Sequence, residues 1–144
     1  VQPLRAGLLE LAHQVGGAVG QRLAVGVEPE GALHRVEAAF AAEAPLVLTT
    51  GGTGVAPRDV THEATLSVVD RLVPGIPEAL RADSLAKTPH GLLSRGVAGT
   101  VGGALVVNLP GSPGGCRDGY GIVRPALRHA LGLLADAPTA HRQT

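Results

Sequence analysis

Two glycine-rich segments hold most of the residues in this 144-residue sequence whose types and spacing suit chemistry. The first, residues 49–61, reads TTGGTGVAPRDVT and places Arg58 and Asp59 behind its glycines. Glycines after a strand let backbone N–H groups approach an anion, and the N-terminus of a following helix adds partial positive charge. The segment therefore suits a phosphate-binding loop, and it suits equally a strand-to-helix turn whose glycines serve backbone geometry alone.

Two common nucleotide-binding motifs do not fit this first segment. No Gly-Lys-Ser/Thr follows the glycines, so it is not a P-loop, and Pro57 stands where the dinucleotide fingerprint needs its third glycine. Asp59 offers a carboxylate of the kind that Mg²⁺ binds together with substrate oxygens, and Arg58, Thr53 and Thr61 accompany it. Asp59 is also well placed to cap the next helix.

The second segment, residues 108–115, places Ser112 between two prolines. A nucleophile elbow requires Gly-x-Ser-x-Gly, and Pro110 occupies the position of the first glycine, so serine-hydrolase chemistry fits poorly. Two interpretations stay open: recognition of a ligand by the backbone, or a rigid connection between a strand and a helix.

Other reactive residue types give weaker signals. The six histidines include no pair at metal-binding spacing, so we expect surface or capping roles for them. Cys116 lies beside a glycine-rich helix start, a position that can make a thiol reactive, but we expect it to be an inert packed thiol. Ser94 and Arg95 form a solvated turn unless they face the glycine-rich segments, in which case Arg95 suits phosphate recognition.

Composition excludes several classes of protein. The 12 basic and 12 acidic residues cancel, and aromatic residues are 1% of the chain, so neither a basic nucleic-acid surface nor a stacking platform is expected. No stretch is apolar enough to span a membrane, and the single cysteine favours a reducing compartment. With 44% hydrophobic residues, the 21 glycines and 11 prolines should punctuate a folded chain. We expect one cytoplasmic domain over residues 1–144.

The remaining sequence must supply elements that position the two segments. Apolar spacing predicts strands and helices in alternation, and hence a three-layer α/β/α domain with a mostly parallel sheet. Ligands in such sheets bind at the carboxyl ends of the strands, where both segments start. The expected strands are 23–27, 45–50, 97–100 and 104–108; the expected helices are 4–15, 30–42, one from Thr61 through Leu72, one from Pro77, and a long last one through Leu134, before a frayed tail at 138–144.

Taken in order, several motifs resemble one known family. They are LTTGGTG at 48–54, PRDVT at 57–61, EAT at 63–65, PG at 74–75, LSR at 93–95, AG at 98–99 and NLPGSP at 108–113. Together they resemble the molybdenum-cofactor biosynthesis family, which includes the bacterial Mog and MoaB proteins and the G domains of gephyrin-like and plant molybdopterin-inserting proteins. The resemblance extends from about Pro45 onward, and residues 113–119 are most similar to the Mog branch.

The resemblance implies an α/β homotrimer that binds molybdopterin and ATP with Mg²⁺, transfers AMP to the phosphate of the pterin and releases pyrophosphate. It also implies a protein partner that inserts molybdenum. Asp59 would be the catalytic residue, and Asp59 with Glu28 would hold the metal. The implied substrate-binding residues are Thr50, Gly51, Gly52, Thr53, Gly54, Arg58, Thr61, Ser94, Arg95, Pro110, Gly111 and Ser112.

Two departures from the family pattern bear on function. The family opens with a strand before its first helix, whereas this sequence starts at what resembles that helix, so we expect further N-terminal residues that an intact mass would reveal. Active members carry Asp just before the helix that follows the second strand, where this sequence has Glu28. The alternatives to an adenylyltransferase are therefore a non-catalytic pterin-binding paralogue and, in a third class, a ligand-free assembly module.

Overall fold

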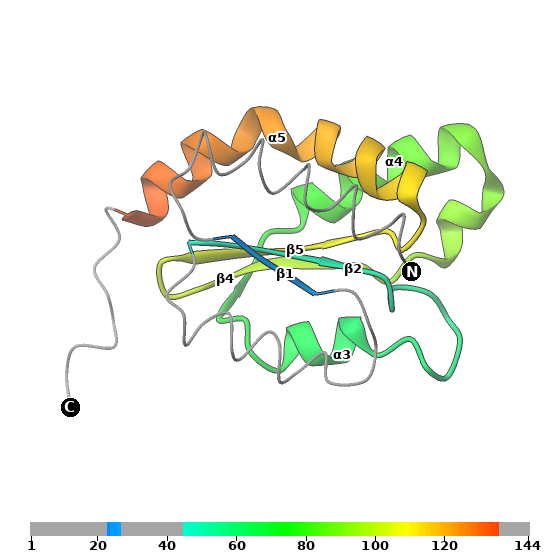
Figure 1. The fold of residues 1–144 in the computed structure, drawn as a ribbon, viewed down its shortest axis with the longest axis horizontal. Coiled ribbons are helices and arrows are strands. Elements are labelled where there is room, and N and C mark those ends of the chain that lie inside the picture. The colour runs from blue at the N-terminus through cyan, green and yellow to red at the C-terminus, as the bar shows by residue number, and fades with distance from the viewer. Residues whose placement is uncertain (1–22, 27–44, 136–144) are drawn as a thin grey trace.

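The computed structural model describes the backbone of residues 23–26 and the whole of residues 45–135, and this part of the chain forms a layered α/β unit (Figure 1). Its elements are β1 (Leu23–Gly26), β2 (Leu46–Thr50), α3 (Thr61–Leu66), β3 (Arg71–Leu72), α4 (Gly75–Lys87), the 3-10 helix η1 (Pro89–Leu93), β4 (Ala98–Val101), β5 (Ala104–Leu109) and α5 (Pro113–Ala135).

The described strands form one sheet in the order β1-β2-β5-β4-β3. β1 pairs with β2 and β2 with β5 in parallel, whereas β4 pairs antiparallel with β5 and with β3. The expectation of a mostly parallel sheet is therefore corrected to a mixed sheet, because the short Val101–Ala104 connection makes a hairpin that a parallel pair cannot use. Parallel pairing still brings the carboxyl ends of β2 and β5 to the same edge.

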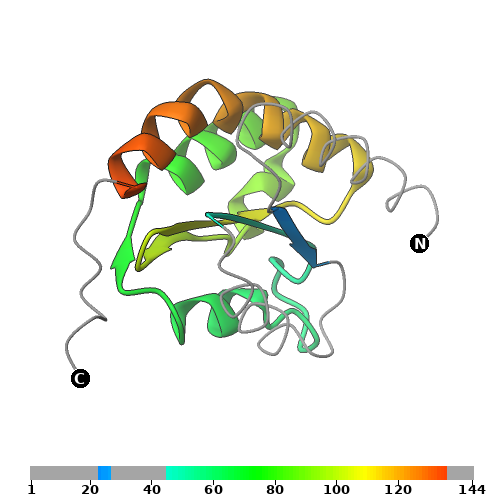
Figure 2. The same ribbon diagram turned by 60° about the vertical axis from the view of Figure 1, so that its left-hand side comes forward.

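Helices cover both faces of this sheet, which confirms the three-layer α/β/α class. α4 and α5 lie on one face and α3 lies on the other (Figures 1 and 2). β2 and β5 are buried along their whole lengths, as continuous apolar runs predict for strands covered on both faces. α5 packs on the sheet through residues at helical spacing: Cys116, Tyr120, Val123 and Leu127.

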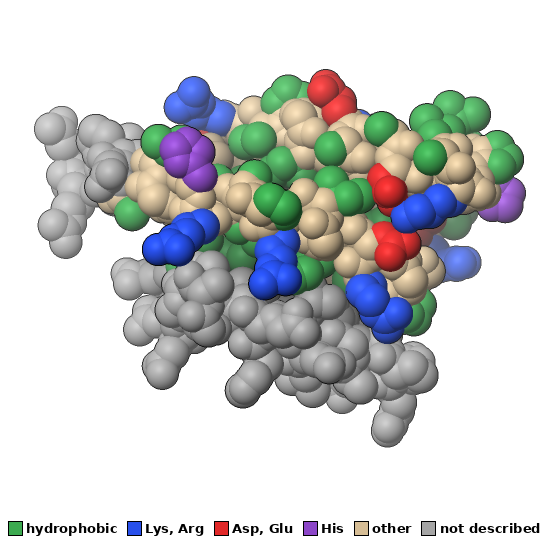
Figure 3. Space-filling view, turned by 90° about the horizontal axis from the view of Figure 1, so that it is seen from above, with side chains coloured by type: hydrophobic (Ala, Val, Ile, Leu, Met, Phe, Trp, Pro, Cys, Tyr) green, Lys and Arg blue, Asp and Glu red, His purple; other side chains and the backbone are tan. Residues whose placement is uncertain are grey.

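The outer face of the α4–α5 layer mixes hydrophobic side chains with charges of both signs (Figure 3). Lys87 of α4 ties the two helices together, since its Nζ lies 2.7 Å from Asp83 Oδ2 and 3.0 Å from Asp118 Oδ2 on α5. Within the described ranges, no helix is long and apolar enough to cross a membrane.

One predicted helix is wrong in its second half. The helix expected from Thr61 through Leu72 ends at Leu66, and Arg71–Leu72 instead pairs with β4. The Ser67 hydroxyl donates to Ala64 O at 2.7 Å, and Val68 and Val69, which are β-branched, follow it. Val69 packs against Val47 and Val106 on the sheet, so tertiary burial outweighs the helical spacing of these residues.

The other boundaries agree closely with expectation. β2, β4 and β5 fall within a residue or two of their predicted positions, β1 (Leu23–Gly26) lies within the predicted strand 23–27, and α4 begins at Gly75 rather than Pro77. The predicted helices 4–15 and 30–42 and the frayed tail 138–144 lie outside the described residues. The assignment of residues 1–144 to a single domain stays a prediction.

Candidate functional site

Two connections meet at the carboxyl edge of the sheet. The glycine loop, residues 51–60, follows β2, and the proline loop, residues 110–112, follows β5. Gly51 N donates to Leu109 O at 3.3 Å, and a Cβ on Gly111 would stand 3.0 Å from Gly51 Cα. The loops are therefore in direct backbone contact, as parallel pairing of β2 and β5 requires.

Thr61, the first residue of α3, folds the start of the glycine loop. Its Oγ1 donates to Gly51 O at 2.8 Å, and its N–H donates to Gly52 O at 3.1 Å. Gly51 and Gly52 have φ values of 82° and 66°, and a Cβ on Gly52 would lie 2.1 Å from Thr61 Oγ1. Only glycine fits position 52, and the buried Thr61 hydroxyl is engaged within the protein.

Arg95 holds the rest of the glycine loop. Its backbone N–H donates to Thr53 O at 2.7 Å, and its Nε donates to Gly54 O at 2.7 Å. Its Nη2 donates to Asp59 O at 2.6 Å, and its Nη1 pairs with the Glu63 carboxylate on α3. The hydrogen bond from this guanidinium lowers the pKa of Glu63, and the same bond raises the pKa of Arg95.

A consequence of these bonds is that every carbonyl from Gly51 to Gly54 accepts a hydrogen bond from Thr61 or Arg95. The N–H groups of Gly52, Thr53 and Gly54 donate to no acceptor among the described residues. Successive backbone N–H groups whose carbonyls are tied back form the kind of concave donor surface that binds anions. The glycine loop thus has the donor arrangement of an anion site.

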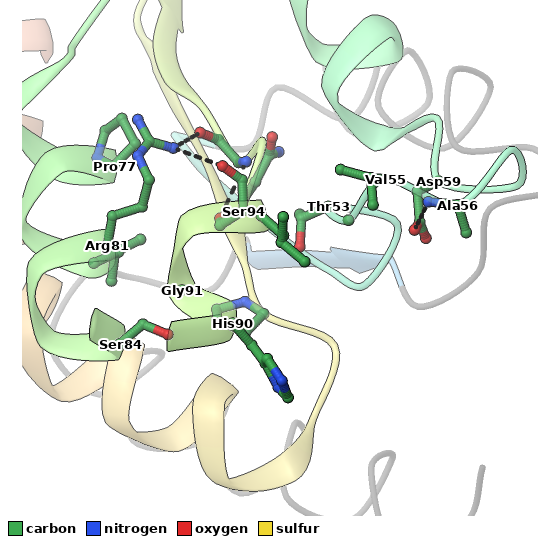
Figure 4. A pocket seen from close by; sticks show the side chains of 16 residues that line it. Thr53, Val55, Ala56, Asp59, Pro77, Arg81, Ser84, His90, Gly91 and Ser94 are labelled. Atoms are coloured by element: carbon green, nitrogen blue, oxygen red, sulfur yellow. Dashed lines mark hydrogen bonds between the residues drawn. The ribbon is translucent and has the colours of Figure 1, made fainter. Parts of the chain in front are cut away.

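A cavity of about 530 Å³ opens beside this loop, between it and α4 (Figure 4). Five residues predicted for the site line it: Thr53, Gly54, Asp59, Ser94 and Pro110. The remaining lining residues are Val55, Ala56, Pro77, Leu80, Arg81, Ser84, His90, Gly91, Leu93, Gly96 and Asn108. The cavity therefore lies between the glycine loop, the proline loop, α4 and η1.

Asp59 is the acidic member of this lining. Its Oδ2 accepts the Ala56 N–H at 3.0 Å, and its own N–H donates to Ala56 O at 2.9 Å, which closes a tight turn. A Cβ on Gly54 would lie 2.7 Å from Asp59 Oδ2, so the missing side chain at Gly54 makes room for the carboxylate. The side chain is half-buried, and its second oxygen, Oδ1, takes part in neither of these hydrogen bonds.

Arg81 on α4 is a cavity residue that the sequence analysis missed. Its Nη1 donates to Gly96 O at 2.9 Å and Ser94 O at 3.4 Å (Figure 4), and no carboxylate of the described chain lies within salt-bridge distance of it. A signal existed, because Arg81 lies one helical turn after the buried Pro77 and so shares the inward face of α4. A charged residue on an inward helix face usually has a partner or a task.

Asn108 was also missed, although it stands in a quoted motif. It is 2% exposed, and its Nδ2 donates to Thr49 Oγ1 at 2.8 Å and Thr65 Oγ1 at 3.0 Å. Its Oδ1 accepts the Val97 N–H at 3.1 Å. Asn108 therefore joins β2, α3 and the start of β4 at the wall of the cavity, which it lines.

The proline loop is fixed by its own helix. Ser112 Oγ accepts the Gly115 N–H at 3.1 Å, and Ser112 O accepts the Cys116 N–H at 2.8 Å, so Ser112 caps α5. Cys116 is buried, and burial raises the pKa of its thiol, in agreement with the expected packed cysteine.

The other predicted site residues lie around the cavity rather than in its wall. Gly51 and Gly111 form the contact between the loops, whereas Gly52 packs against Thr61 at the start of α3. Arg95 lies behind the glycine loop. Arg58 is exposed and does not line the cavity. Thr50 is buried, with no partner for Oγ1 among the described residues. Glu28 lies outside the described residues.

The described residues contain no group of three or more histidine, cysteine or acidic side chains that could hold a metal by themselves. The cavity lining supplies one carboxylate, that of Asp59. Mg²⁺ is usually held by one or two carboxylates together with phosphate oxygens and water. The donor set therefore fits a Mg²⁺ ion that arrives with a phosphate-bearing ligand, and it does not fit a metal caged by protein alone.

Comparison with known proteins gives a consistent result. The model of a family described as a probable molybdopterin binding domain matches residues 5–129. Molybdopterin adenylyltransferase from Escherichia coli K12 is 45% identical over 95 residues, which cover 65% of this chain and 49% of that protein. Gephyrin from Dictyostelium discoideum is 47% identical over 93 residues, 65% of this chain and 13% of that protein. The chain thus spans about half the length of the curated adenylyltransferase, and less of the longer relative.

Solved structures of the same kind share the fold. The molybdopterin biosynthesis Mog protein from Mycobacterium ulcerans has a TM-score of 0.71 and 42% identity, over 74% of this chain and 70% of that one. The molybdopterin biosynthesis enzyme MoaB from Thermus thermophilus has a TM-score of 0.68 and 48% identity, over 78% of this chain and 71% of that one.

Proposed function

Because the chain belongs to the family of molybdopterin-binding domains, we propose that it adenylylates molybdopterin, transferring AMP from ATP to the phosphate of the pterin and releasing pyrophosphate. The observation that carries this proposal is the glycine loop, whose four carbonyls from Gly51 to Gly54 are tied back by Thr61 and Arg95. The N–H groups of residues 52–54 are thereby offered to phosphate oxygens.

The cavity beside the loop suits the two substrates in size and character. Its volume of about 530 Å³ falls in the ordinary range for small-molecule sites. Apolar residues such as Leu80, Leu93 and Pro77 would pack against flat ring systems, while Thr53 and Ser94 would supply hydrogen bonds. Phosphoryl transfer depends on positioning and charge neutralisation, which are the two properties that this lining offers.

Asp59 is the proposed catalytic residue. Its carboxylate lies in the cavity lining, where it would hold Mg²⁺ or orient the attacking phosphate. Mg²⁺, when bound with ATP, neutralises charge that develops on the phosphate oxygens. Glu28 remains the proposed second carboxylate for the metal.

The test is incubation of the protein with molybdopterin, ATP and Mg²⁺, with chromatography of the adenylated pterin and an assay of pyrophosphate. We expect Asp59→Asn to reduce the rate by about 100-fold or more, the range for losing a group that acts on the transition state. Asp118→Asn, which removes an exposed carboxylate of α5 outside the cavity, is the matched control and should retain activity. Equal rates for the wild type and Asp59→Asn would refute the assigned role.

Arg81 is the proposed cationic contact for a substrate phosphate. Its guanidinium lies in the cavity wall with no acidic partner among the described residues, so an anionic ligand would supply the missing charge. We expect Arg81→Gln to raise the KM for ATP or for molybdopterin about tenfold. Arg128→Gln, an exposed change on α5, should leave both KM values as they are, and the same outcome for Arg81→Gln would remove this residue from the binding site.

A non-catalytic pterin-binding paralogue is the second candidate. It is favoured by the sequence, because the family pattern has Asp just before the helix that follows the second strand, where this chain has Glu28. Calorimetry separates the candidates. Molybdopterin binding without Mg²⁺-dependent consumption of ATP would establish the paralogue, whereas turnover would eliminate it, and no affinity for pterin or nucleotide would favour an assembly module.

The resemblance to the family is the support for a further proposal about the setting of the protein. We propose a cytoplasmic homotrimer that passes its product to a molybdenum-insertion partner. Analytical ultracentrifugation tests the trimer, and a mass other than three times that of one chain would contradict it.

A further inference from the structure

Arg95 lies behind the glycine loop, on the side away from the cavity. Its neighbours Ser94 and Gly96 both line the cavity, and Arg95 does not. Successive side chains of an extended segment point to opposite sides, and Ser94 has the extended φ and ψ of −71° and 126°. The side chain of Arg95 therefore points toward α3, where it meets Glu63.

The bonds of Arg95 reach both ends of the segment that carries Asp59. Its Nε fixes Gly54 O at 2.7 Å, and its Nη2 fixes Asp59 O at 2.6 Å. The backbone N–H adds a bond to Thr53 O, and Arg95 O in turn contacts His62 Nδ1 on α3. One residue thus sets the distance between the start of the segment and the residue proposed for catalysis.

The charge of Arg95 is already neutralised within the protein. Its guanidinium pairs with the Glu63 carboxylate through Nη1 and, at 3.4 Å, through Nη2. Four of the five N–H donors that a guanidinium carries are accounted for by Gly54, Asp59 and Glu63. Little remains for a substrate phosphate, which separates Arg95 from Arg81.

We propose that Arg95 is a positioning residue, which with Glu63 as its counter-ion holds Gly54 and Asp59 at a fixed separation and so aims the Asp59 carboxylate into the cavity. This proposal rests on the proposed function and differs from the sequence expectation that Arg95 binds substrate directly. Lysine cannot replace it, because an ammonium on a flexible stem does not reproduce the four hydrogen bonds that the planar guanidinium directs to Gly54, Asp59 and Glu63.

The kinetic test compares Arg95→Lys in two backgrounds. In the wild type, we expect kcat to fall by 10-fold or more while the KM for ATP changes less than threefold. In Asp59→Asn, the same substitution should have little further effect on kcat, because the residue through which Arg95 acts is already lost. Equal factors in both backgrounds, or a raised KM with an unchanged kcat, would overturn the proposal.

A second measurement needs no turnover, so it separates failure of this proposal from failure of the proposed function. Amide hydrogen exchange at Ala56 and Asp59, whose N–H groups bond within the loop, should quicken about tenfold in Arg95→Lys while exchange in β5 stays unchanged. Unchanged exchange at both amides would overturn the proposal even if the protein is an active adenylyltransferase.

Two further variants guard against a folding defect. Glu63→Gln keeps an acceptor for Arg95 and loses the charge, so it should quicken the same amides by a smaller factor. Lys87→Met breaks a comparably exposed ion pair between α4 and α5, remote from the loop, and should leave Ala56 and Asp59 as in the wild type. If Arg95→Lys fails to fold, Glu63→Gln decides alone: no change at Ala56 and Asp59 contradicts the proposal.

Discussion

The glycine loop and the proline loop occupy equivalent places at the ends of neighbouring strands, yet they are held in different ways. The glycine loop is fixed by residues that come after it in the chain, chiefly Thr61 and Arg95, and Arg95 lies 45 residues after Thr50, the end of β2. The proline loop is fixed by the first turn of its own helix, through Ser112 and Gly115.

The difference shows that two loops with similar glycine- and proline-rich sequences can be stabilised by different kinds of interaction, long-range in one and local in the other. Long-range bonds make the conformation of the glycine loop depend on the tertiary structure, so its free N–H groups are aligned only in the folded protein. A helix cap is local, and it needs only the helix to form. We therefore expect changes in the glycine loop to cost more stability, and more activity, than changes in the proline loop.

Gly52→Ala should have the largest effect. The new Cβ would lie 2.1 Å from Thr61 Oγ1, and the φ of 66° disfavours any side chain. Strain and the displacement of Thr61 together should lower the free energy of unfolding by about 3 kcal/mol. For a chain of this length, the melting temperature should fall by about 10 °C, measured by calorimetry or circular dichroism.

The matched control for this change is Gly114→Ala, beside the proline loop. A Cβ there meets nothing within 4 Å, and residue 114 is helical, so alanine should stabilise the protein by up to about 1 kcal/mol. Equal melting temperatures for the two variants would break the contrast between the loops.

Ser112→Ala should have an intermediate effect. Losing the bond from Gly115 N–H to Ser112 Oγ should cost about 1 kcal/mol, the usual value of an N-cap, and the loss should appear in the denaturant midpoint. Ser112→Asp keeps a capping oxygen and should restore stability. Because Ser112 does not line the cavity, the KM for ATP should hold in the alanine variant. A raised KM would show instead that the hydroxyl contacts substrate.

Much of the fold was predictable, because the strands are recognisable from their local sequence. β2 and β5 are continuous apolar runs that end in glycine or proline, and both are found where predicted. The helix from Thr61 was predicted to be too long, because Val69 and Leu72 have helical spacing. In the structure Val69 packs against the sheet and Leu72 belongs to β3. The antiparallel direction of β4 was within reach of the sequence, because the two residues between β4 and β5, Gly102 and Gly103, leave room only for a hairpin.

The site was predictable in its loops and much less so in its supports. Asp59, Gly54 and Thr53 stand in a motif, whereas Arg81 reaches the same cavity from a helix with no motif of its own. Arg95 was found by its motif and given a direct role in binding, although its bonds run to the loop and to Glu63. The sequence identifies arginines that could bind a phosphate, but only the fold shows which arginine is already bonded to other protein groups.

The smallest expected effect is a pH dependence confined to the glycine loop. The bond from Arg95 lowers the pKa of Glu63 from its ordinary value of 4.5, so folding favours the ionised carboxylate. The stabilisation from this pair is complete above pH 4.5 and is lost as the pH falls through the lowered pKa of the folded state. The cap at Ser112 involves no titratable side chain and should not change over this range.

This dependence is measured as the difference in melting temperature between the wild type and Glu63→Gln. At pH 7 the wild type should be slightly more stable, since an exposed ion pair contributes little. Below pH 4.5 the difference should shrink toward zero, because protonated glutamate and glutamine are then nearly equivalent. Comparing the two proteins at each pH cancels the contributions of the titratable groups that both retain. A constant difference down to pH 2 would mean that the Glu63 charge does not help to hold the glycine loop, and the contrast with the proline loop would then rest on Thr61 and neutral hydrogen bonds alone.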